Sequence, residues 1–347
     1  MTRVGVGMFR IGRRAPDGGL ALRSPLYPLK FEPLFKANVW GGTRLPAFLN
    51  RPAPLPDPIG EAWVLSDVDG SPSRVANGPL AGATLRELLA ADERGMLGAA
   101  KPVHGRFPLL LKFIDSRQEL SVQVHPTDDL ARAKRPGTAG KTEAWYVLDA
   151  DPAASRIYAG FRPGVTAEHF RQSLAEKSTP ETLHAFTPRR GDCVFLPAGT
   201  VHAIGAGVFL FEVQQTSDTT YRLYDWDRVD PKTGRGRELH VDDGLACSDF
   251  GRGPCHPVSP AVISNGKWKH ERLVGCGHFT LTRMVTANPV TVGAAGACRA
   301  VVCISGGGTL GGEPVVPGDV VLLPASVGAA EFTPTGMSTL LECGLPQ

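Results

Sequence analysis

A short internal repeat is the feature that most constrains the fold of this chain. Residues 191–202 read GDCVFLPAGTVH, and residues 318–329 read GDVVLLPASVGA. Glycine, aspartate and a Pro-Ala pair stand at the same offsets in both copies. Repetition of a structural unit indicates two related domains. We therefore expect two β-barrels, of which the second has Ala329 at the offset where the first has His202.

Composition supports a mainly β fold with a few short helices. The chain of 347 residues contains 41 glycines and 30 prolines, which favours many short strands joined by turns. Its length suffices for two compact β domains. Apolar spacing and capping residues predict helices over 84–97, 127–134 and 166–176.

We expect three parts along the chain. Residues 1–25 form a flexible N-terminal extension, residues 26–245 a metal-binding catalytic domain, and residues 246–347 a second β domain without metal ligands. Residues 231–260 are polar and rich in turn-forming residues, so we expect them to link the two domains.

Charge and cysteine usage exclude several classes of protein. A formal net charge of +3 does not suggest a nucleic-acid or membrane partner. We find no apolar run of about 18 residues that predicts a membrane helix, and no signal peptide at the start. Seven cysteines without a CxxC pair are typical of thiols in a reducing compartment, so we expect a cytoplasmic protein.

Two strand-like stretches carry polar side chains on one face. Side chains of a strand alternate between its faces, so Ser121, Gln123 and His125 lie on the same side of the predicted strand 120–125. The same period places Lys141 and Glu143 together in the next stretch. We expect both polar faces to point into the barrel.

A third stretch brings a second histidine to this face. Pro197 and Gly199 suit a tight turn that returns the chain and delivers His202 toward the barrel. Two imidazoles and a carboxylate suit a divalent transition metal. Gln123 offers a weaker fourth ligand or, alternatively, a hydrogen bond to a ligand. Such a set leaves room for substrate, which is typical of a catalytic metal site.

These motifs resemble a known family. Residues 191–202 resemble the second cupin motif, and the wider set is similar to the type I mannose-6-phosphate isomerases (phosphomannose isomerases), especially their short bacterial form. The matching stretches are 29–35, 40–42, 60–63, 121–126, 141–145, 191–202 and 212–226. The resemblance implies two cupin-like jelly-roll barrels, and it does not extend to residues 1–25.

The resemblance also implies an activity and a site. It implies an isomerase that interconverts mannose 6-phosphate and fructose 6-phosphate with one Zn²⁺ per chain. The metal ligands carried over are Gln123, His125, Glu143 and His202, and the catalytic residues carried over are Arg222 and Lys141. This chain departs from the family at Val64, where an acidic residue is frequent, and at Gly140, where larger relatives have a histidine. Position 140 therefore cannot supply the proton carrier.

The proton-transferring base stays open among three residues. Isomerisation moves a proton between C1 and C2 of the sugar through a cis-enediol, which requires a positioned base. Lys141, Asp218 and Glu212 are the candidates, although Glu212 could instead orient a ligand or Arg222. Arg222 supplies positive charge to the enediolate or the phosphate, and its alternative role is a plain salt bridge with Asp218.

Further expectations concern the substrate and rival functions. A sugar phosphate needs cations and hydroxyl groups, for which Lys112 and Ser121 are candidates, with Glu212 nearby. The rival functions are an iron-dependent cupin oxygenase and a non-catalytic sensor of sugar phosphates. The complete ligand set, Lys141 and Arg222 favour the isomerase. Two fused barrels are compatible with a monomer.

Overall fold

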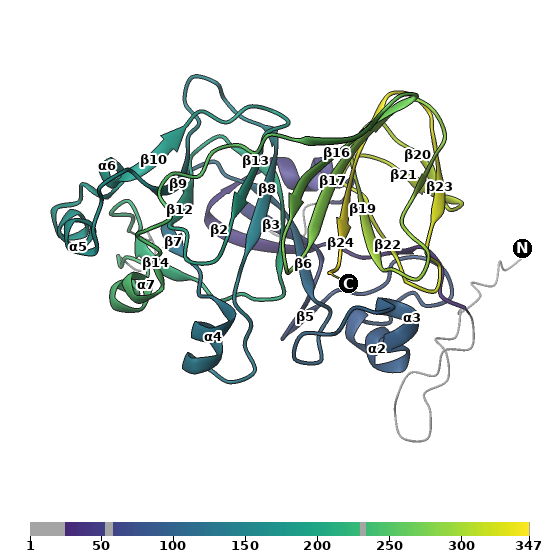
Figure 1. Ribbon diagram of the computed structural model, residues 1–347, viewed down its shortest axis with the longest axis horizontal. Helices are drawn as coiled ribbons and strands as arrows, with labels where there is room; N and C mark the ends of the chain where they lie inside the picture. Colours follow the sequence, from purple (N-terminus) through teal and green to yellow (C-terminus); the bar gives the residue numbers. More distant parts are fainter. Residues whose placement is uncertain (1–24, 53–57, 230–233, 347) are drawn as a thin grey trace, which may run out of the picture.

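The computed structural model describes residues 25–52, 58–229 and 234–346. It is mainly β, as predicted. In Figure 1 most strands of the first half of the chain lie on the left and those of the C-terminal half on the right, with α2 and α3 below the latter. Residues 1–24 of the predicted extension lie outside the described residues. Within the described part, no helix is long and apolar enough to cross a membrane.

Two antiparallel sheets build the first half. The larger has the order β11-β8-β13-β6-β3-β2, and the smaller has the order β10-β9-β12-β7-β14. Trp145 and Leu210 of the larger sheet pack with Ile157 and Ile204 of the smaller in one apolar cluster, so the sheets face each other. The strands of the larger sheet are β2 Leu34–Gly42, β3 Ile59–Leu65, β6 Leu109–Asp115, β8 Glu143–Asp149, β11 Cys193–Leu196 and β13 Phe209–Gln215. Those of the smaller are β7 Val122–Val124, β9 Ile157–Phe161, β10 Leu183–Phe186, β12 His202–Ile204 and β14 Tyr221–Tyr224.

The C-terminal half also contains two antiparallel sheets around an apolar cluster. Their orders are β1-β22-β19-β24-β17-β16-β15 and β18-β23-β20-β21. The strands of the first are β1 Leu29–Lys30, β15 Ala261–Asn265, β16 Trp268–Gly275, β17 Thr280–Thr286, β19 Arg299–Ser305, β22 Val320–Leu323 and β24 Ser338–Gly344. Those of the second are β18 Val290–Val292, β20 Gly308–Leu310, β21 Glu313–Val315 and β23 Ala330–Pro334. A separate small pair joins β4 Asp67–Val68 to β5 Ser71–Pro72.

The predicted helices are present, with one difference. Thr127 and Thr166 cap α4 and α5 as the sequence indicates. The single helix predicted over 84–97 is instead two helices, because the backbone of Asp92 leaves the helical region and its side chain caps the second helix. The bounds are α1 Arg44–Phe48, α2 Leu85–Ala91, α3 Glu93–Leu97, α4 Asp128–Lys134, α5 Ala167–Glu176, α6 Thr179–Thr182 and α7 Val241–Cys247.

The segment predicted as a linker is partly ordered. Residues 241–247 form α7, which packs against β14 and buries Cys247. The turn-rich composition of residues 231–260 hides this helix, which is only seven residues long. The described part of the segment therefore covers the first half as well as connecting the halves.

Both copies of the repeat form the same turn. Gly191 and Gly318 have φ angles of 90° and 91°, a conformation that glycine adopts without strain. Asp192 and Asp319 each accept a hydrogen bond from the backbone N–H three residues earlier, at 2.8 and 3.0 Å. The repeat is therefore structural as well as sequential, and it begins a strand in each half.

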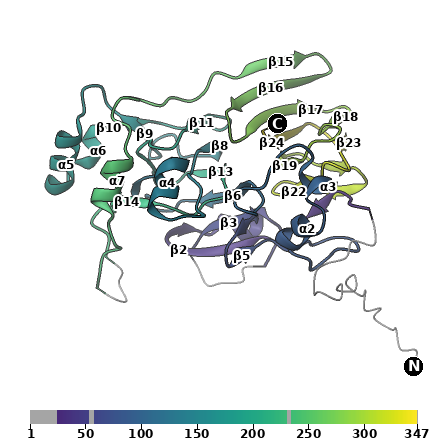
Figure 2. The same ribbon diagram turned by 60° about the horizontal axis from the view of Figure 1, so that its bottom comes forward.

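The two halves share a continuous apolar core. One cluster contains Phe113 and Phe211 of the first half together with Phe279 and Leu341 of the second. Figure 2 shows the strands of the two halves side by side, with α2 and α3 near the junction. The β1 strand belongs to the first half by sequence and pairs with β22 of the second. This contact fixes the first half, and the cavity within it, against the second.

Candidate metal centre

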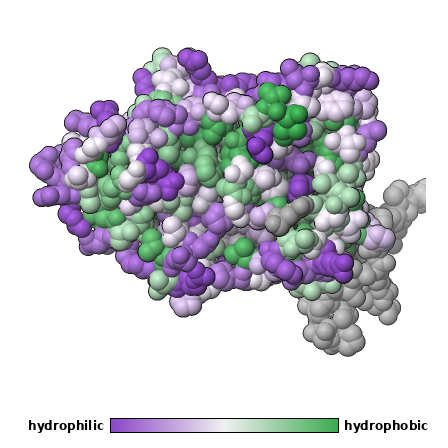
Figure 3. Space-filling view, in the orientation of Figure 1, coloured by the Kyte–Doolittle hydropathy of each residue, from purple (hydrophilic) through white to green (hydrophobic). Residues whose placement is uncertain are grey.

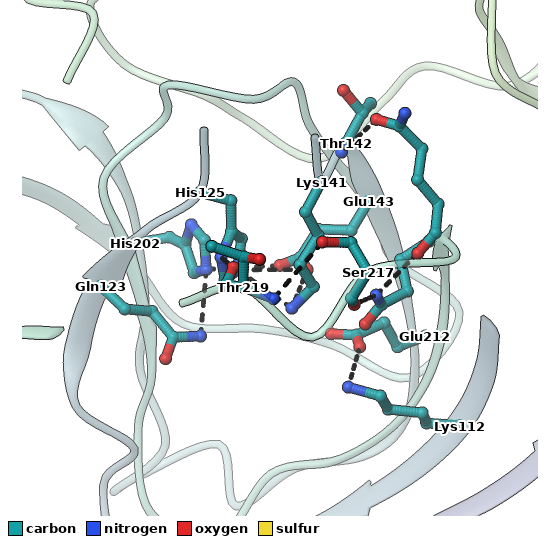
Figure 4. Close-up of polar contacts among 12 residues, drawn as sticks. Lys112, Gln123, His125, Lys141, Thr142, Glu143, His202, Glu212, Ser217 and Thr219 are labelled. Atoms are coloured by element: carbon teal, nitrogen blue, oxygen red, sulfur yellow. Dashed lines mark hydrogen bonds and ion pairs between the residues drawn. The ribbon is translucent and has the colours of Figure 1, made fainter. Parts of the chain in front are cut away.

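Three buried side chains converge between the two sheets of the first half. His125 follows β7, Glu143 begins β8 and His202 begins β12. Their potential ligand atoms all lie within 4.8 Å of one another (Figure 4). The His125, Glu143 and His202 side chains predicted to meet are therefore brought together.

Backbone carbonyl groups orient both imidazoles. The Nδ1 atom of His125 lies 3.0 Å from the carbonyl oxygen of Thr219, and that of His202 lies 2.8 Å from the carbonyl oxygen of Thr200. Because a carbonyl oxygen can only accept, each Nδ1 carries the hydrogen and each Nε2 keeps a free lone pair. The two Nε2 atoms lie 3.5 and 3.3 Å from the carboxylate oxygens of Glu143.

Burial tunes these groups toward binding a cation. Burial and the nearby Lys141 lower the pKa of His125 well below its ordinary value. Burial also lowers the pKa of His202 to about 4, against the hydrogen bond to Thr200. Both rings are therefore neutral at neutral pH, which is the form that binds a metal.

The carboxylate of Glu143 lacks its full set of partners. Burial, with a contribution from Glu212, raises the pKa of Glu143 to about 7, although Lys141 opposes the shift. Its Oε1 atom is buried without a hydrogen-bond partner. A buried carboxylate whose two oxygens each lie near an imidazole lone pair is the environment that a divalent cation satisfies. The residues present therefore fit a metal ion.

Gln123 lies beside the cluster. It is directly opposite His202 in the pairing of β7 with β12, and its Nε2 atom is 3.3 Å from the Nε2 of that ring. Rotation of the terminal amide by 180° exchanges its nitrogen and oxygen. The amide oxygen then faces the same point as the imidazole lone pairs.

Lys141 reaches the cluster from the loop before β8. Its Nζ atom lies 2.9 Å from Glu143 Oε2 and 3.1 Å from His125 Nε2. The ammonium group supplies a positive charge to the buried carboxylate. It is also within reach of any ligand that touches the three converging side chains.

A second buried ionic group stands next to the first. The Nζ atom of Lys112 lies 3.2 Å from Glu212 and 3.6 Å from Glu61. Burial alone would lower the pKa of Lys112, but the two carboxylates outweigh it and raise this pKa. The pKa of Glu212 is lowered for the converse reason: burial opposes ionisation, and Lys112 and Lys141 overcome it. Trp145 donates a hydrogen bond of 2.9 Å to Glu212.

One polar cavity of about 310 Å³ adjoins the centre. It is lined by predicted site residues, namely Lys112, Ser121, Gln123, Lys141, Glu212, Asp218 and Arg222. Five further polar or aromatic side chains line it that were not predicted as site residues: Asn38, Trp40, Glu61, Thr220 and Arg237. No spacing in the sequence pointed to Arg237, whose guanidinium pairs with Asp225 through one hydrogen bond of 2.8 Å and a second, shorter one.

Arg222 and Asp218 do not pair with each other in the described part of the chain. Arg222 donates from Nη1 to the carbonyl oxygen of Glu238 at 2.8 Å, and its buried Nε atom lacks a hydrogen-bond partner. Asp218 is exposed at the rim of the cavity. The structure therefore does not contain the salt bridge between Arg222 and Asp218 that was the alternative role of Arg222.

Steric contacts require a glycine at position 140. A Cβ atom there would lie 2.5 Å from the backbone nitrogen of Asp128 and 2.8 Å from the carbonyl oxygen of Pro126. The loop therefore has no space for a side chain at this position. Two backbone segments are in close contact at the place that a side chain would occupy.

Comparison with known proteins identifies relatives over almost the whole chain. Residues 29–197 match the family described as phosphomannose isomerase type I, catalytic domain. Mannose-6-phosphate isomerase ManA of Bacillus subtilis is 35% identical over 314 residues, covering 87% of this chain and 94% of the relative. A mannose-6-phosphate isomerase of Streptococcus mutans is 34% identical, covering 88% of this chain and 95% of the relative.

Solved structures of the same family have a similar fold. The crystal structure of the Bacillus subtilis mannose 6-phosphate isomerase superposes with a TM-score of 0.82 at 30% identity, covering 92% of this chain and 99% of the other. A phosphomannose isomerase variant from Salmonella typhimurium superposes with a TM-score of 0.74 at 18% identity, covering 93% of this chain and 100% of the other. The second similarity concerns the fold.

Proposed function

Because the chain belongs to the type I phosphomannose isomerase family, we propose that it interconverts mannose 6-phosphate and fructose 6-phosphate at its metal centre. The observation that carries the proposal is the buried convergence of His125, Glu143 and His202 beside a polar cavity. The cavity presents both cations and carboxylates, which suits a substrate that has hydroxyl groups and a phosphate.

We propose that the centre holds one Zn²⁺ per chain. The ligands are the Nε2 atoms of His125 and His202, the carboxylate of Glu143 and the amide oxygen of Gln123. Two nitrogen ligands and a carboxylate with a weaker fourth ligand are typical of catalytic zinc. When bound, the ion acts as a Lewis acid that polarises the carbonyl group of the open-chain sugar.

Lys141 is the residue to which we assign proton transfer. In its amine form it takes the proton from C2 of the aldose and returns it to C1 of the cis-enediol. The position of Nζ beside two of the ligands supports this role. Asp218, at the rim of the cavity, is the second candidate. Glu212 is less suited to taking the proton, because its lowered pKa makes its carboxylate a weaker base.

The remaining cavity residues bind the substrate in our proposal. Arg222 stabilises negative charge on the enediolate or the phosphate, since its buried Nε atom has no other partner. Lys112 of β6, Glu212 of β13 and Ser121, which directly precedes β7, contact the sugar. All three line the cavity.

For the whole molecule we propose two cupin-like jelly-roll barrels, over residues 26–245 and 246–347. The matching turns at Gly191 and Gly318 support this division, although β1 crosses it to pair with β22. We propose that the second barrel holds no metal, because among its described residues exposed Ala329 stands where the first has buried His202. We also propose a cytoplasmic monomer, which suits seven free cysteines in a chain that already fuses two barrels.

A coupled assay tests the activity. Metal-loaded protein is incubated with mannose 6-phosphate while formation of fructose 6-phosphate is followed. We expect turnover that a chelator abolishes and added Zn²⁺ restores. Absence of turnover with zinc, manganese, cobalt and iron would contradict the isomerase assignment.

A variant tests the centre separately. His202→Ala should lose bound metal and activity by at least about 100-fold, because it removes a ligand. His169→Ala, on the exposed face of α5, is the matched control and should retain both. A fully active His202→Ala variant would refute the metal centre, whatever reaction the protein catalyses.

A further inference from the structure

The loop that carries Lys141 is held in place at three consecutive amide groups. Gly140 donates its N–H to the side chain of Asp128 at 2.7 Å. Lys141 donates to the carbonyl oxygen of Pro126 at 3.0 Å, and Thr142 donates to the side chain of Gln215 at 2.8 Å. Two of the three acceptors are therefore side chains, on α4 and β13 (Figure 4 shows Lys141 and Thr142 from this loop).

The two acceptor side chains are joined to each other. Gln215 donates its amide hydrogen to the same Asp128 Oδ1 atom at 3.0 Å. The backbone N–H of Gln215 also donates to the carbonyl oxygen of Thr142 at 3.2 Å. Gln215 thus contacts Thr142 on both sides, and its own amide is oriented by Asp128. This donor and acceptor pattern requires the Gln215 amide oxygen to face Thr142.

The close approach of the two segments depends on Gly140. Its missing side chain lets the loop lie against residues 126–128, which brings the Gly140 N–H into reach of Asp128. The second carboxylate oxygen, Oδ2, is 3.9 Å from His278 of the C-terminal half, too far for a hydrogen bond. Oδ1 therefore makes the two bonds that hold the loop.

We infer that Asp128 and Gln215 are positioning residues for Lys141. They fix the backbone on both sides of this lysine, and so fix the starting point from which its side chain reaches Glu143 and His125. Displacement of a reacting group by about 1 Å can lower a rate about 100-fold. The inference rests on the proposed function, because it concerns the residue to which proton transfer is assigned.

Three variants test the role of Asp128. Asp128→Ala removes the acceptor of two hydrogen bonds, Asp128→Asn keeps an acceptor oxygen, and Asp129→Ala removes the neighbouring charge on the same helix turn. The Asp128 side chain is 45% exposed, so its truncation leaves no closed cavity. Asp129 lies in the same first turn and pairs with Arg132, away from the loop.

The readouts are kcat, KM for mannose 6-phosphate and bound zinc. We expect Asp128→Ala to lower kcat about 10- to 100-fold while KM stays within about threefold and one zinc remains bound. Asp128→Asn should recover most of kcat, and Asp129→Ala should match the wild type. A Gln215→Leu variant, which removes the second acceptor, should lower kcat in the same way.

Several outcomes would overturn the inference. Wild-type kcat in Asp128→Ala would do so, as would an equal loss in Asp128→Asn or in Asp129→Ala. A loss of kcat that merely follows loss of zinc would show that Asp128 supports the metal site instead. If the wild-type protein itself fails to isomerise mannose 6-phosphate, the proposed function fails, and that result is distinct from an active wild type with a fully active Asp128→Ala.

Discussion

Lysine and glutamate side chains that are buried beside the candidate metal centre neutralise each other's charge. Lys112 lies between Glu61 and Glu212, and its ammonium group is 5.2 Å from the centre of the Trp63 ring. Burying a charge is costly unless a partner of opposite sign is fixed next to it. This arrangement keeps Glu212 ionised and oriented within the cavity.

Removal of Lys112 should therefore destabilise the fold. In Lys112→Met, two carboxylates near the cavity lose their counter-charge, which is expected to cost about 3–5 kcal/mol in the free energy of unfolding. Urea denaturation measures the change. The exposed Lys101→Met variant is the control and should stay within about 0.5 kcal/mol of the wild type.

A compensating variant makes this prediction specific. Adding Glu212→Gln to Lys112→Met removes one of the unpaired charges, so the double variant should recover part of the lost stability. If Lys112→Met is as stable as the wild type, or if the double variant is less stable than the sum of its single changes, the ionic explanation is wrong.

Some features of the site could be predicted from single residues of the sequence, and others could not. Lys141 and Glu143 meet as the strand period predicted, although Lys141 stands in the loop before β8 and His125 follows β7. The carbonyl groups of Thr200 and Thr219, which orient the histidines, carry no side-chain signal. Arg237 lines the cavity from a loop after β14, and only the tertiary fold brings that loop to the cavity.

Among the structural elements, the helices illustrate how much local sequence decides. Thr84 begins α2 with a capping box: its hydroxyl accepts from the N–H of Glu87, whose carboxylate accepts from the N–H of Thr84. The apolar side of α2 enters the core shared by the two halves through Leu85 and Leu88. The cap therefore fixes the end of a helix that packs at the junction.

Loss of this cap should have a moderate effect. We expect Thr84→Ala to lower the free energy of unfolding by about 1 kcal/mol, because the first turn loses the acceptor of the Glu87 N–H. Thermal or urea denaturation measures the loss. Thr187→Ala, at an exposed position outside any helix or strand, is the matched control, and an equal effect there would contradict the capping explanation.

The pair of strands β16 and β17 contains a pH-sensitive contact. Glu271 is directly opposite Arg283, which contacts its carboxylate at 2.6 and 2.9 Å, and Lys269 is 2.7 Å away. Burial alone would raise the pKa of Glu271, but Lys269 and Arg283 outweigh it and lower this pKa. The ionised form is therefore favoured in the folded protein.

The sign of the pH effect follows from this shift. A carboxylate with a lowered pKa stabilises the fold above its unfolded pKa, and the contribution disappears as the pH falls through the folded pKa. We expect Glu271→Gln to be less stable than the wild type by about 1–3 kcal/mol at pH 7. The difference should shrink below about pH 4. Urea denaturation across this range measures it, and a difference that is independent of pH would contradict the ionic origin.

The positions of helices and strands were predictable where the sequence pattern is local, such as a helix cap, and less so elsewhere. The helices α4 and α5 begin after their predicted caps. The break at Asp92 was missed because the apolar spacing continues across it. The expected strand over 120–125 is shorter, since β7 covers only Val122–Val124.

At the scale of the whole molecule, the two halves are bound by a common core and by polar contacts. Arg283 of the C-terminal half donates to the carbonyl oxygen of Gly191 at 3.1 Å, and its guanidinium lies near the ring of Tyr146. Figure 3 shows hydrophobic residues across the middle of this face and hydrophilic residues around its edge. The repeat predicted two related units, but it contained no information about the surface on which they meet.

A core substitution in one half should therefore lower the stability of the other half as well. Leu341→Ala, in β24, is expected to cost about 2–5 kcal/mol and to lower the melting temperature of the entire protein in a single transition. Calorimetry and residual isomerase activity after heating should report the same midpoint. Two transitions, of which only one moves, would show that the halves unfold independently.

The pairing of β1 with β22 has a consequence for biosynthesis. Leu29 lies opposite Leu322, so a strand made early in translation acquires its partner only when the chain is almost complete. Contacts between such distant residues form slowly, because a long loop must close first. The N-terminal strand therefore stays unpaired until Leu322 has been synthesised. A chain released before that point would leave the edge of this strand free to pair with other nascent chains.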